Sequence, residues 1–365
     1  MLNLKSRQYI YIFVFIMLFG IFGLMLYNYV KDPYGYFSDE SYDGGMEYMH
    51  YFKAKNVLLE DYDAFIVGGS NSGALSTDLV NYYTGYNTYS FSFNLGRYEP
   101  YYMYIKYLIE NTDVKCIFLH LSNIEMYSKF VKRDTVVDRI PAIVTPNKLD
   151  DIIEPLSFLT KTPGKEVLIT RKCLPNGQID WSMQKKEYDY SPDEYVQEHV
   201  LNYYGWWCAQ WMKLELEQEI IDENIQYMKD IKKMCDDANV ELIVMIGANF
   251  TSNRYKFECN AYYDYLEKVV EITDVYDFSG FTEINANPYN FYDYEHYNNI
   301  VADEELHFIF GNSTLTQEFG YHLTRDNITE YLIERKRDYV DMMKEYEETG
   351  EIKYGSYDDM SNISK

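Results

Sequence analysis

One serine stands out in this sequence because its surroundings favour nucleophilic chemistry. Ser70 follows the apolar run AFIVGG (64–69), whose two final glycines permit a tight turn. Such a turn would present the hydroxyl at the carboxyl end of a strand, beside helix N-terminal amides that can bind an oxyanion. Glycine-rich turns of this kind also bind phosphate groups or simply reverse the chain. A serine nucleophile therefore needs a base elsewhere in the sequence.

The base is sought among six histidines. His296 lies in the aromatic, Asn-rich segment NFYDYEHYNN, three residues after Asp293. This spacing can bring the carboxylate to one imidazole nitrogen and leave the other nitrogen free for a hydroxyl. The same acid-x-x-His spacing at His50 and His307 falls on expected helices. We therefore predict a Ser70–His296–Asp293 triad.

These side chains need a scaffold, and apolar runs separated by helical patterns provide one. Runs rich in Val, Ile and Phe predict buried strands. Helical patterns fall between and around these runs. Their alternation favours an α/β fold, a three-layer α/β/α sandwich of the flavodoxin type, with a mainly parallel five-stranded sheet. Functional residues in such sheets gather at the carboxyl ends of the strands. The expected strands are 64–69, 89–94, 116–122, 241–247 and 274–279, and the expected helices are 46–60, 100–110, 214–238, 261–272 and 327–348.

Residues 9–30 form an uncharged apolar run, which at about 1.5 Å per residue covers a hydrocarbon core of roughly 30 Å. Lys5 and Arg7 precede it, which favours a cytoplasmic N-terminus with the rest of the chain outside. A cleaved signal peptide is the alternative. We favour an uncleaved single-pass anchor, because the run is longer than a signal core and no small-x-small site follows.

The stretch from about 128 to 211 interrupts the alternation of strands and helices. It carries scattered prolines and the aromatic residues of 203–211. We interpret it as an insertion that either caps the site or contacts a polymer, or else packs against the sheet or the membrane interface. The organisation expected is then an anchor over 1–30, a linker and short helix over 31–60, the main domain over 61–325, a helix over 326–348 and a flexible tail over 349–365.

Charge and residue spacing argue against nucleic-acid binding and against a metal or cofactor site. The formal net charge of −25 disfavours nucleic-acid binding, which depends on Lys and Arg neutralising phosphates. The carboxylates do not cluster with histidines, and the five cysteines form no CxxC pair, so neither a metal site nor a cofactor is expected.

The candidate residues resemble the conserved blocks of the SGNH, or GDSL-like, hydrolase superfamily. Residues 68–72 (GGSNS) resemble its first block, and residues 293–296 (DYEH) its last. Gly96 matches the glycine of the second block, and Asn123 stands near the place of the third-block asparagine. The resemblance implies an oxyanion hole made by the N–H groups of Ser70 and Gly96 with the Asn123 side chain. The aspartate that usually precedes the nucleophile is replaced by Gly69.

The anchor followed by DPYGYF (32–37) also resembles bacterial members of this superfamily that act beside membrane-bound O-acyltransferases. These include proteins of alginate acetylation and of D-alanyl transfer to lipoteichoic acid. The resemblance implies an extracytoplasmic serine esterase or O-acyltransferase whose partner is a cell-surface polysaccharide or teichoic-acid-like polymer. The alternatives are a non-catalytic polysaccharide-binding or acyltransferase-partner protein, and a phosphate-binding α/β domain, which the absence of a Lys from the glycine loop disfavours.

Overall fold

The chain folds around a single mixed sheet in the computed structural model, which describes residues 6–38, 44–94, 96–122, 125–126, 139–162, 172–201, 217–251, 258–315 and 319–349. Its strand order is β2-β1-β3-β4-β5-β6. Neighbours from β2 to β5 pair in parallel, and β6 pairs antiparallel with β5. This confirms an α/β fold with a mainly parallel sheet. The strands are β1 (Ala64–Gly68), β2 (Thr88–Ser92), β3 (Cys116–Leu121), β4 (Glu241–Ile246), β5 (Val275–Asp277) and β6 (Tyr321–Leu323).

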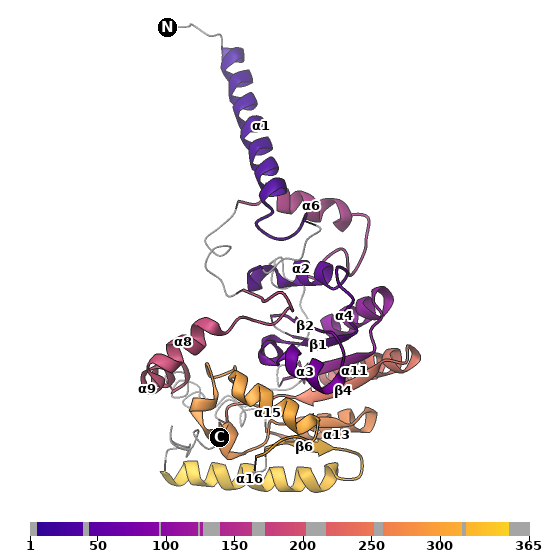
Figure 1. The fold of residues 1–365 in the computed structure, drawn as a ribbon, viewed down its shortest axis with the longest axis vertical. Coiled ribbons are helices and arrows are strands. Elements are labelled where there is room, and N and C mark those ends of the chain that lie inside the picture. Colours follow the sequence, from indigo (N-terminus) through magenta and orange to yellow (C-terminus); the bar gives the residue numbers. More distant parts are fainter. Residues whose placement is uncertain are drawn as a thin grey trace.

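The expectation of five strands is wrong by one, because β6 was missed. That strand is three residues long and follows Gly320. A run so short shows no clear alternation of apolar and polar residues, so its sequence does not stand out from a loop. Its pairing with β5 closes one side of the sheet, next to the C-terminal helix (Figure 1).

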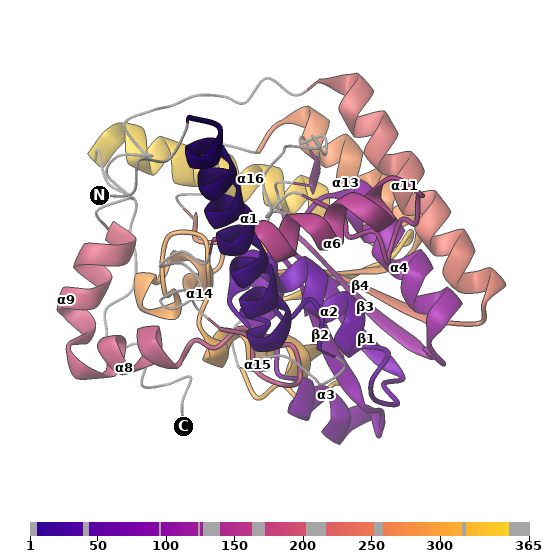
Figure 2. The same ribbon diagram turned by 90° about the horizontal axis from the view of Figure 1, so that it is seen from above.

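Helices lie on both faces of the sheet (Figures 1 and 2). From β1 to β2 the chain moves in one direction across the sheet, and from β2 through β3 and β4 to β5 it moves in the other. Because such crossovers are right-handed, the helix between β1 and β2 lies on one face, and the three helices that connect β2 to β5 lie on the opposite face. The contacts agree: α11 packs on both α4 and α13, whereas α3 packs on α15. The helices are α2 (Met49–Asn56), α3 (Thr77–Thr84), α4 (Tyr98–Asn111), α11 (Gln218–Asp237), α13 (Asn260–Ile272), α14 (Glu283–Ala286), α15 (Asn299–Ile309) and α16 (Ile328–Thr349), with the 3-10 turns η1 (Met46–Tyr48), η2 (Ser70–Ala74) and η6 (Pro288–Asn290).

The N-terminal helix α1 (Ser6–Lys31) projects from this body (Figure 1). Its residues Arg7–Lys31 are long and apolar enough to cross a membrane, with a mean hydropathy of 2.5. Most of its large apolar side chains are exposed. A helix of this kind is consistent with an anchor or with a signal sequence.

The described parts of the expected insertion, residues 139–162 and 172–201, connect two distant regions. They form α6 (Asp150–Thr160), α8 (Ser182–Tyr190), α9 (Pro192–Val196) and the π-helix η4 (Gln197–Leu201). Helix α6 packs against α1, and α9 packs against η6. The aromatic residues of 203–211 and the tail from 350 lie outside the described residues.

Tyrosines fill much of the core, and their hydroxyl groups find partners there. The hydroxyls of Tyr98 and Tyr265 lie 2.6 Å apart, and the Tyr107 hydroxyl donates to the Ala54 carbonyl at 2.7 Å. A buried Tyr hydroxyl usually has a hydrogen-bond partner, because an unsatisfied one offsets part of the free energy gained by burying the ring. The high tyrosine content therefore serves packing as well as the surface.

Helix α2 contributes a buried cation beside strand β2. The Lys53 side chain has no exposed surface, and its Nζ donates to the carbonyls of Ser90 and Ser92 at 3.1 and 2.7 Å. Burial lowers the pKa of Lys53 to about 8, because the charged form loses its hydration. On the same strand, the Ser90 N–H donates to the Asn176 carbonyl at 2.8 Å. Lys53 and Asn176, which bond to these backbone groups of β2, both lie outside the sheet.

Candidate functional site

Ser70 lies where the central strand β1 ends. All five residues of β1 are buried, between β2 and β3. A Cβ at Gly68 would come 2.7 Å from Ser72 Oγ and 2.9 Å from His120 Cβ, so only glycine fits this position. The Ser72 N–H and hydroxyl both bond to the Gly69 carbonyl, at 3.1 and 2.7 Å. These contacts fix the loop and leave Ser70 half-buried at the carboxyl edge of the sheet.

The structure brings Ser70, His296 and Asp293 together in one hydrogen-bonded chain. Ser70 Oγ lies 2.8 Å from His296 Nε2. His296 Nδ1 lies 2.8 and 2.9 Å from the two carboxylate oxygens of Asp293. The serine and the histidine are 226 positions apart in the sequence, so the fold alone creates this contact.

The electrostatics of Asp293 fix the roles of the imidazole nitrogens. Burial raises the pKa of Asp293, but the neighbouring His296 and the backbone N–H groups of Glu295 and His296 outweigh it and hold that pKa at about 2. The carboxylate is therefore ionised at neutral pH and accepts the Nδ1 proton. Nε2 is then the acceptor for the Ser70 hydroxyl.

The loop that carries His296 is closed by its own backbone. Phe291 and Tyr297 form an antiparallel bridge, and the Tyr292 N–H donates to the His296 carbonyl at 2.7 Å. Asn298 then caps α15 by accepting the Ile300 and Val301 N–H groups, both at 3.1 Å. This tight turn directly before a helix determines where the imidazole lies.

The insertion supplies an aromatic wall that the sequence reasoning missed. The Trp181 ring stacks on Tyr292 at 5.2 Å between centroids and lies 5.3 Å from the His296 ring. Trp181 is held there because the preceding Ile179 N–H donates to the Gly73 carbonyl of the serine loop at 3.2 Å. The sequence offered one signal, a lone Trp next to Asp180 in a Pro-rich stretch, but nothing linked it to the histidine.

Gly96, the expected second-block glycine, lies against the serine loop. A Cβ built on Gly69 would be 3.4 Å from the Gly96 nitrogen, and one built on Gly96 would overlap the Tyr101 hydroxyl. The second position therefore requires glycine, so that its backbone can approach the residue before Ser70. Asn123, the expected third-block residue, lies outside the described residues.

A buried carboxylate supports this side of the site and was not predicted. The Tyr101 hydroxyl donates to Glu125 Oε1 at 2.5 Å, while Glu125 Oε2 accepts the Ser122 N–H and hydroxyl at 2.8 and 2.6 Å. Asn224 from α11 donates to the Glu125 carbonyl at 2.6 Å. This network joins the segment after β3 to the helix that approaches Gly96.

A second buried network lies next to His296 in the sequence. The Tyr297 hydroxyl is 2.9 Å from His120 Nε2 on β3, and the carboxyl group of Glu305 on α15 lies near it. Glu305 Oε1 accepts the Ala248 N–H at 2.6 Å. Burial lowers the pKa of His120 to about 4 and raises that of Glu305 to about 8, so both side chains are neutral at pH 7.

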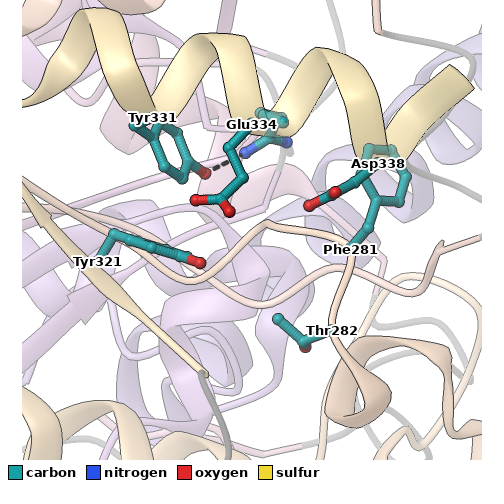
Figure 3. Close-up of a pocket in the computed structure, with 7 residues that line it drawn as sticks. Phe281, Thr282, Tyr321, Tyr331, Glu334 and Asp338 are labelled. Atoms are coloured by element: carbon teal, nitrogen blue, oxygen red, sulfur yellow. Dashed lines mark hydrogen bonds between the residues drawn. The ribbon is translucent and has the colours of Figure 1, made fainter. Parts of the chain in front are cut away.

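Other features of the described residues carry less chemistry. No three His, Cys, Asp or Glu side chains in this part of the chain gather as metal ligands. A small pocket lies beside α16, and its lining includes Phe281, Tyr321, Glu334 and Asp338 (Figure 3). It contains none of the three residues of the hydrogen-bonded chain.

The sequence matches no protein-family model, and the comparison with curated proteins gave no significant match.

Proposed function

We propose that this chain is a membrane-anchored serine esterase or O-acyltransferase of the SGNH type, with its α/β domain outside the cytoplasm. The observation that carries the proposal is the continuous hydrogen bonding from Ser70 Oγ through His296 to Asp293, at 2.8 Å for each link. A Ser-His-Asp arrangement at the carboxyl edge of a parallel sheet suits nucleophilic attack on an acyl carbonyl.

The proposed reaction has two halves. Ser70 Oγ forms a bond to the acyl carbon while His296 Nε2 takes the hydroxyl proton, and the bond to the departing alcohol breaks as that alcohol receives the proton. A water molecule or a sugar hydroxyl then gives its proton to His296 and attacks the acyl-serine, which releases the acyl group and restores Ser70. Asp293 holds the imidazole and stabilises its charged form.

The oxyanion in this scheme is bound by the backbone N–H groups of Ser70 and Gly96. Support comes from the glycine-to-glycine packing, which brings the Gly96 nitrogen next to the residue before Ser70. The side chain of Asn123 is the third proposed donor. Donors fixed before the reaction stabilise the developing charge without having to reorganise.

The fold of SGNH proteins, a three-layer α/β/α sandwich of the flavodoxin type, agrees with the parallel order β2-β1-β3-β4-β5. We take α1 as an uncleaved anchor with a cytoplasmic N-terminus. The proposed acceptor is a cell-surface glycan or teichoic-acid-like polymer, and a membrane-bound O-acyltransferase is the proposed donor of the acyl group.

Labelling with a fluorophosphonate tests the proposed nucleophile. The full-length protein in membranes should label, and Ser70→Ala should abolish labelling. Ser182→Ala is the control, because this exposed serine at the start of α8 lies outside the serine loop, and the variant should still label. Equal labelling of Ser70→Ala and the parent would reject the nucleophile and favour a non-catalytic, polymer-binding role.

A further inference from the structure

Helix α6 presents an apolar face that no described part of the chain covers. Four exposed apolar side chains follow helical spacing from the N-cap onward, beside the exposed polar residues of the helix, namely Leu149 (65% exposed), Ile152 (63%), Ile153 (42%) and Leu156 (47%). Positions i, i+3, i+4 and i+7 share one side of a helix. Such a continuous apolar stripe usually marks a surface that meets lipid or another protein.

The opposite side of α6 is fixed to the body of the molecule. Glu154 is buried, where it accepts the Tyr36 hydroxyl and the Ala142 N–H, both at 3.0 Å. The Phe158 ring stacks on Tyr36 at 4.4 Å between centroids. The stripe therefore points away from the α/β domain, and a rotation of α6 that hid it would break these contacts.

The C-terminal end of α1 forms hydrogen bonds to α6. Asn28 is fully buried, and its Nδ2 donates to the carbonyls of Phe158, Leu159 and Lys161 at 3.0, 2.9 and 2.7 Å. These carbonyls lie at the C-terminal end of α6, where the last C=O groups of a helix have no donor within the helix itself. In Figure 1, α6 lies across the base of α1, between that helix and the sheet.

This contact sets the depth of α6 relative to a membrane. Asn28 is two residues before the end of the apolar run at Val30, which is about 3 Å along the helix axis at roughly 1.5 Å per residue. If α1 spans the bilayer, α6 therefore lies at the outer boundary of the hydrocarbon core. Interfacial helices bury their apolar side to about this depth, roughly 5–10 Å into the headgroup and acyl boundary.

We propose that α6 is an interfacial membrane helix, whose stripe of Leu149, Ile152, Ile153 and Leu156 inserts into the outer leaflet of the same bilayer that α1 crosses. The domain would then be attached to the membrane twice, by a spanning helix and by a helix lying in the surface. This inference rests on the anchoring part of the proposed function and is independent of the acyl-transfer chemistry.

Site-specific fluorescence in the full-length protein tests the proposal. Single cysteines are introduced as Leu156→Cys, Ile16→Cys in the middle of α1, and Tyr190→Cys at the end of α8, which is 91% exposed. Each is labelled with the polarity-sensitive dye NBD and reconstituted in vesicles of phosphatidylcholine and phosphatidylglycerol. The unsubstituted protein, labelled in parallel, corrects for the native cysteines.

The expected result is a blue-shifted NBD emission at Leu156→Cys that is quenched by lipids carrying a nitroxide high on the acyl chain. Tyr190→Cys should show neither effect. An aqueous signal at position 156 with a lipid signal at position 16 would overturn this inference alone, whereas aqueous signals at both would overturn the anchor. A blue shift at 156 that nitroxide lipids do not quench, and that grows with protein density, would assign the stripe to a second copy and reject the proposal.

Discussion

At the residue scale, the decisive feature is the ionised Asp293 behind the imidazole. Its carboxylate has both oxygens within 2.9 Å of His296 Nδ1 and also accepts two backbone N–H groups. An amide at this position keeps the shape but can present an N–H to Nδ1. That would reverse the tautomer, so that Nε2 carries the proton and can no longer act as the proposed base for Ser70.

We therefore expect Asp293→Asn to lower kcat for hydrolysis of an activated ester about a thousandfold or more, in a protein that still unfolds cooperatively on heating but is somewhat less stable than the parent, because the ionised carboxylate also stabilises the fold. Steady-state kinetics with p-nitrophenyl acetate and differential scanning calorimetry give the two measurements. Asp189→Asn, on α8 and paired with Lys185, removes an exposed carboxylate and should leave kcat unchanged. A loss of less than about tenfold in Asp293→Asn would mean that the carboxylate does not orient the base.

At the element scale, a buried polar group lies where the segment after β4, the histidine loop and helix α15 meet, and it contains Ala248, Tyr297 and Glu305. Its centre is the buried side chain of Glu305, whose protonated form the fold favours at neutral pH because burial raises its pKa to about 8. Since the pKa of Glu305 rises from 4.5 to about 8 on folding, the unfolded chain loses this proton first as the pH rises. The contribution of Glu305 to the free energy of unfolding is thus largest below pH 4.5, and it declines until the pH reaches about 8.

Glu305→Gln should remove this decline, because a glutamine can still accept the Ala248 N–H but has no acidic proton to lose. The free energy of unfolding of the parent should fall relative to the variant between about pH 5 and 8, by up to about 1.4 kcal/mol for each pH unit. Urea unfolding at several pH values measures the difference. Parallel curves for the two proteins over this range would show that Glu305 is ionised in the folded state.

At the scale of the whole molecule, α16 is tied to the sheet by a buried cation. Arg335 is 2% exposed, and its guanidinium forms ion pairs with Glu258 at 2.8 Å and with Asp277 at 2.9 Å. The same guanidinium also donates hydrogen bonds to the hydroxyls of Tyr331 and Ser279. Removing one partner of such a network leaves the other charges buried without compensation.

Arg335→Met should therefore destabilise the protein by about 3–5 kcal/mol, measured as the free energy of unfolding in urea. Arg337→Ala is the matched control on the same helix. Its guanidinium pairs with Glu334 in solvent, and an exposed pair contributes about 0–1 kcal/mol. Similar losses in the two variants would contradict the structural role of Arg335.

The periodicity and spacing of the sequence predicted most of the sheet and the three residues of the hydrogen-bonded chain. Long apolar runs indicated the four longer strands of the sheet and β5, and two short motifs pointed to Ser70, His296 and Asp293. The contacts that support these residues were not predictable. Trp181, Glu125 and Glu305 reach the site through pairings between distant segments, and no local pattern marks them. The strand β6 was missed because three residues carry too little pattern.

The buried Lys53 has a consequence for how copies of this protein meet. A strand at the margin of a sheet usually exposes unpaired carbonyls and N–H groups, which invite β-pairing with a neighbouring chain. Here Lys53 and Asn176 already occupy such groups on β2, the first strand in the order. The opposite margin is the three-residue β6. At high local concentration, these molecules would therefore expose few unpaired strand groups through which to aggregate.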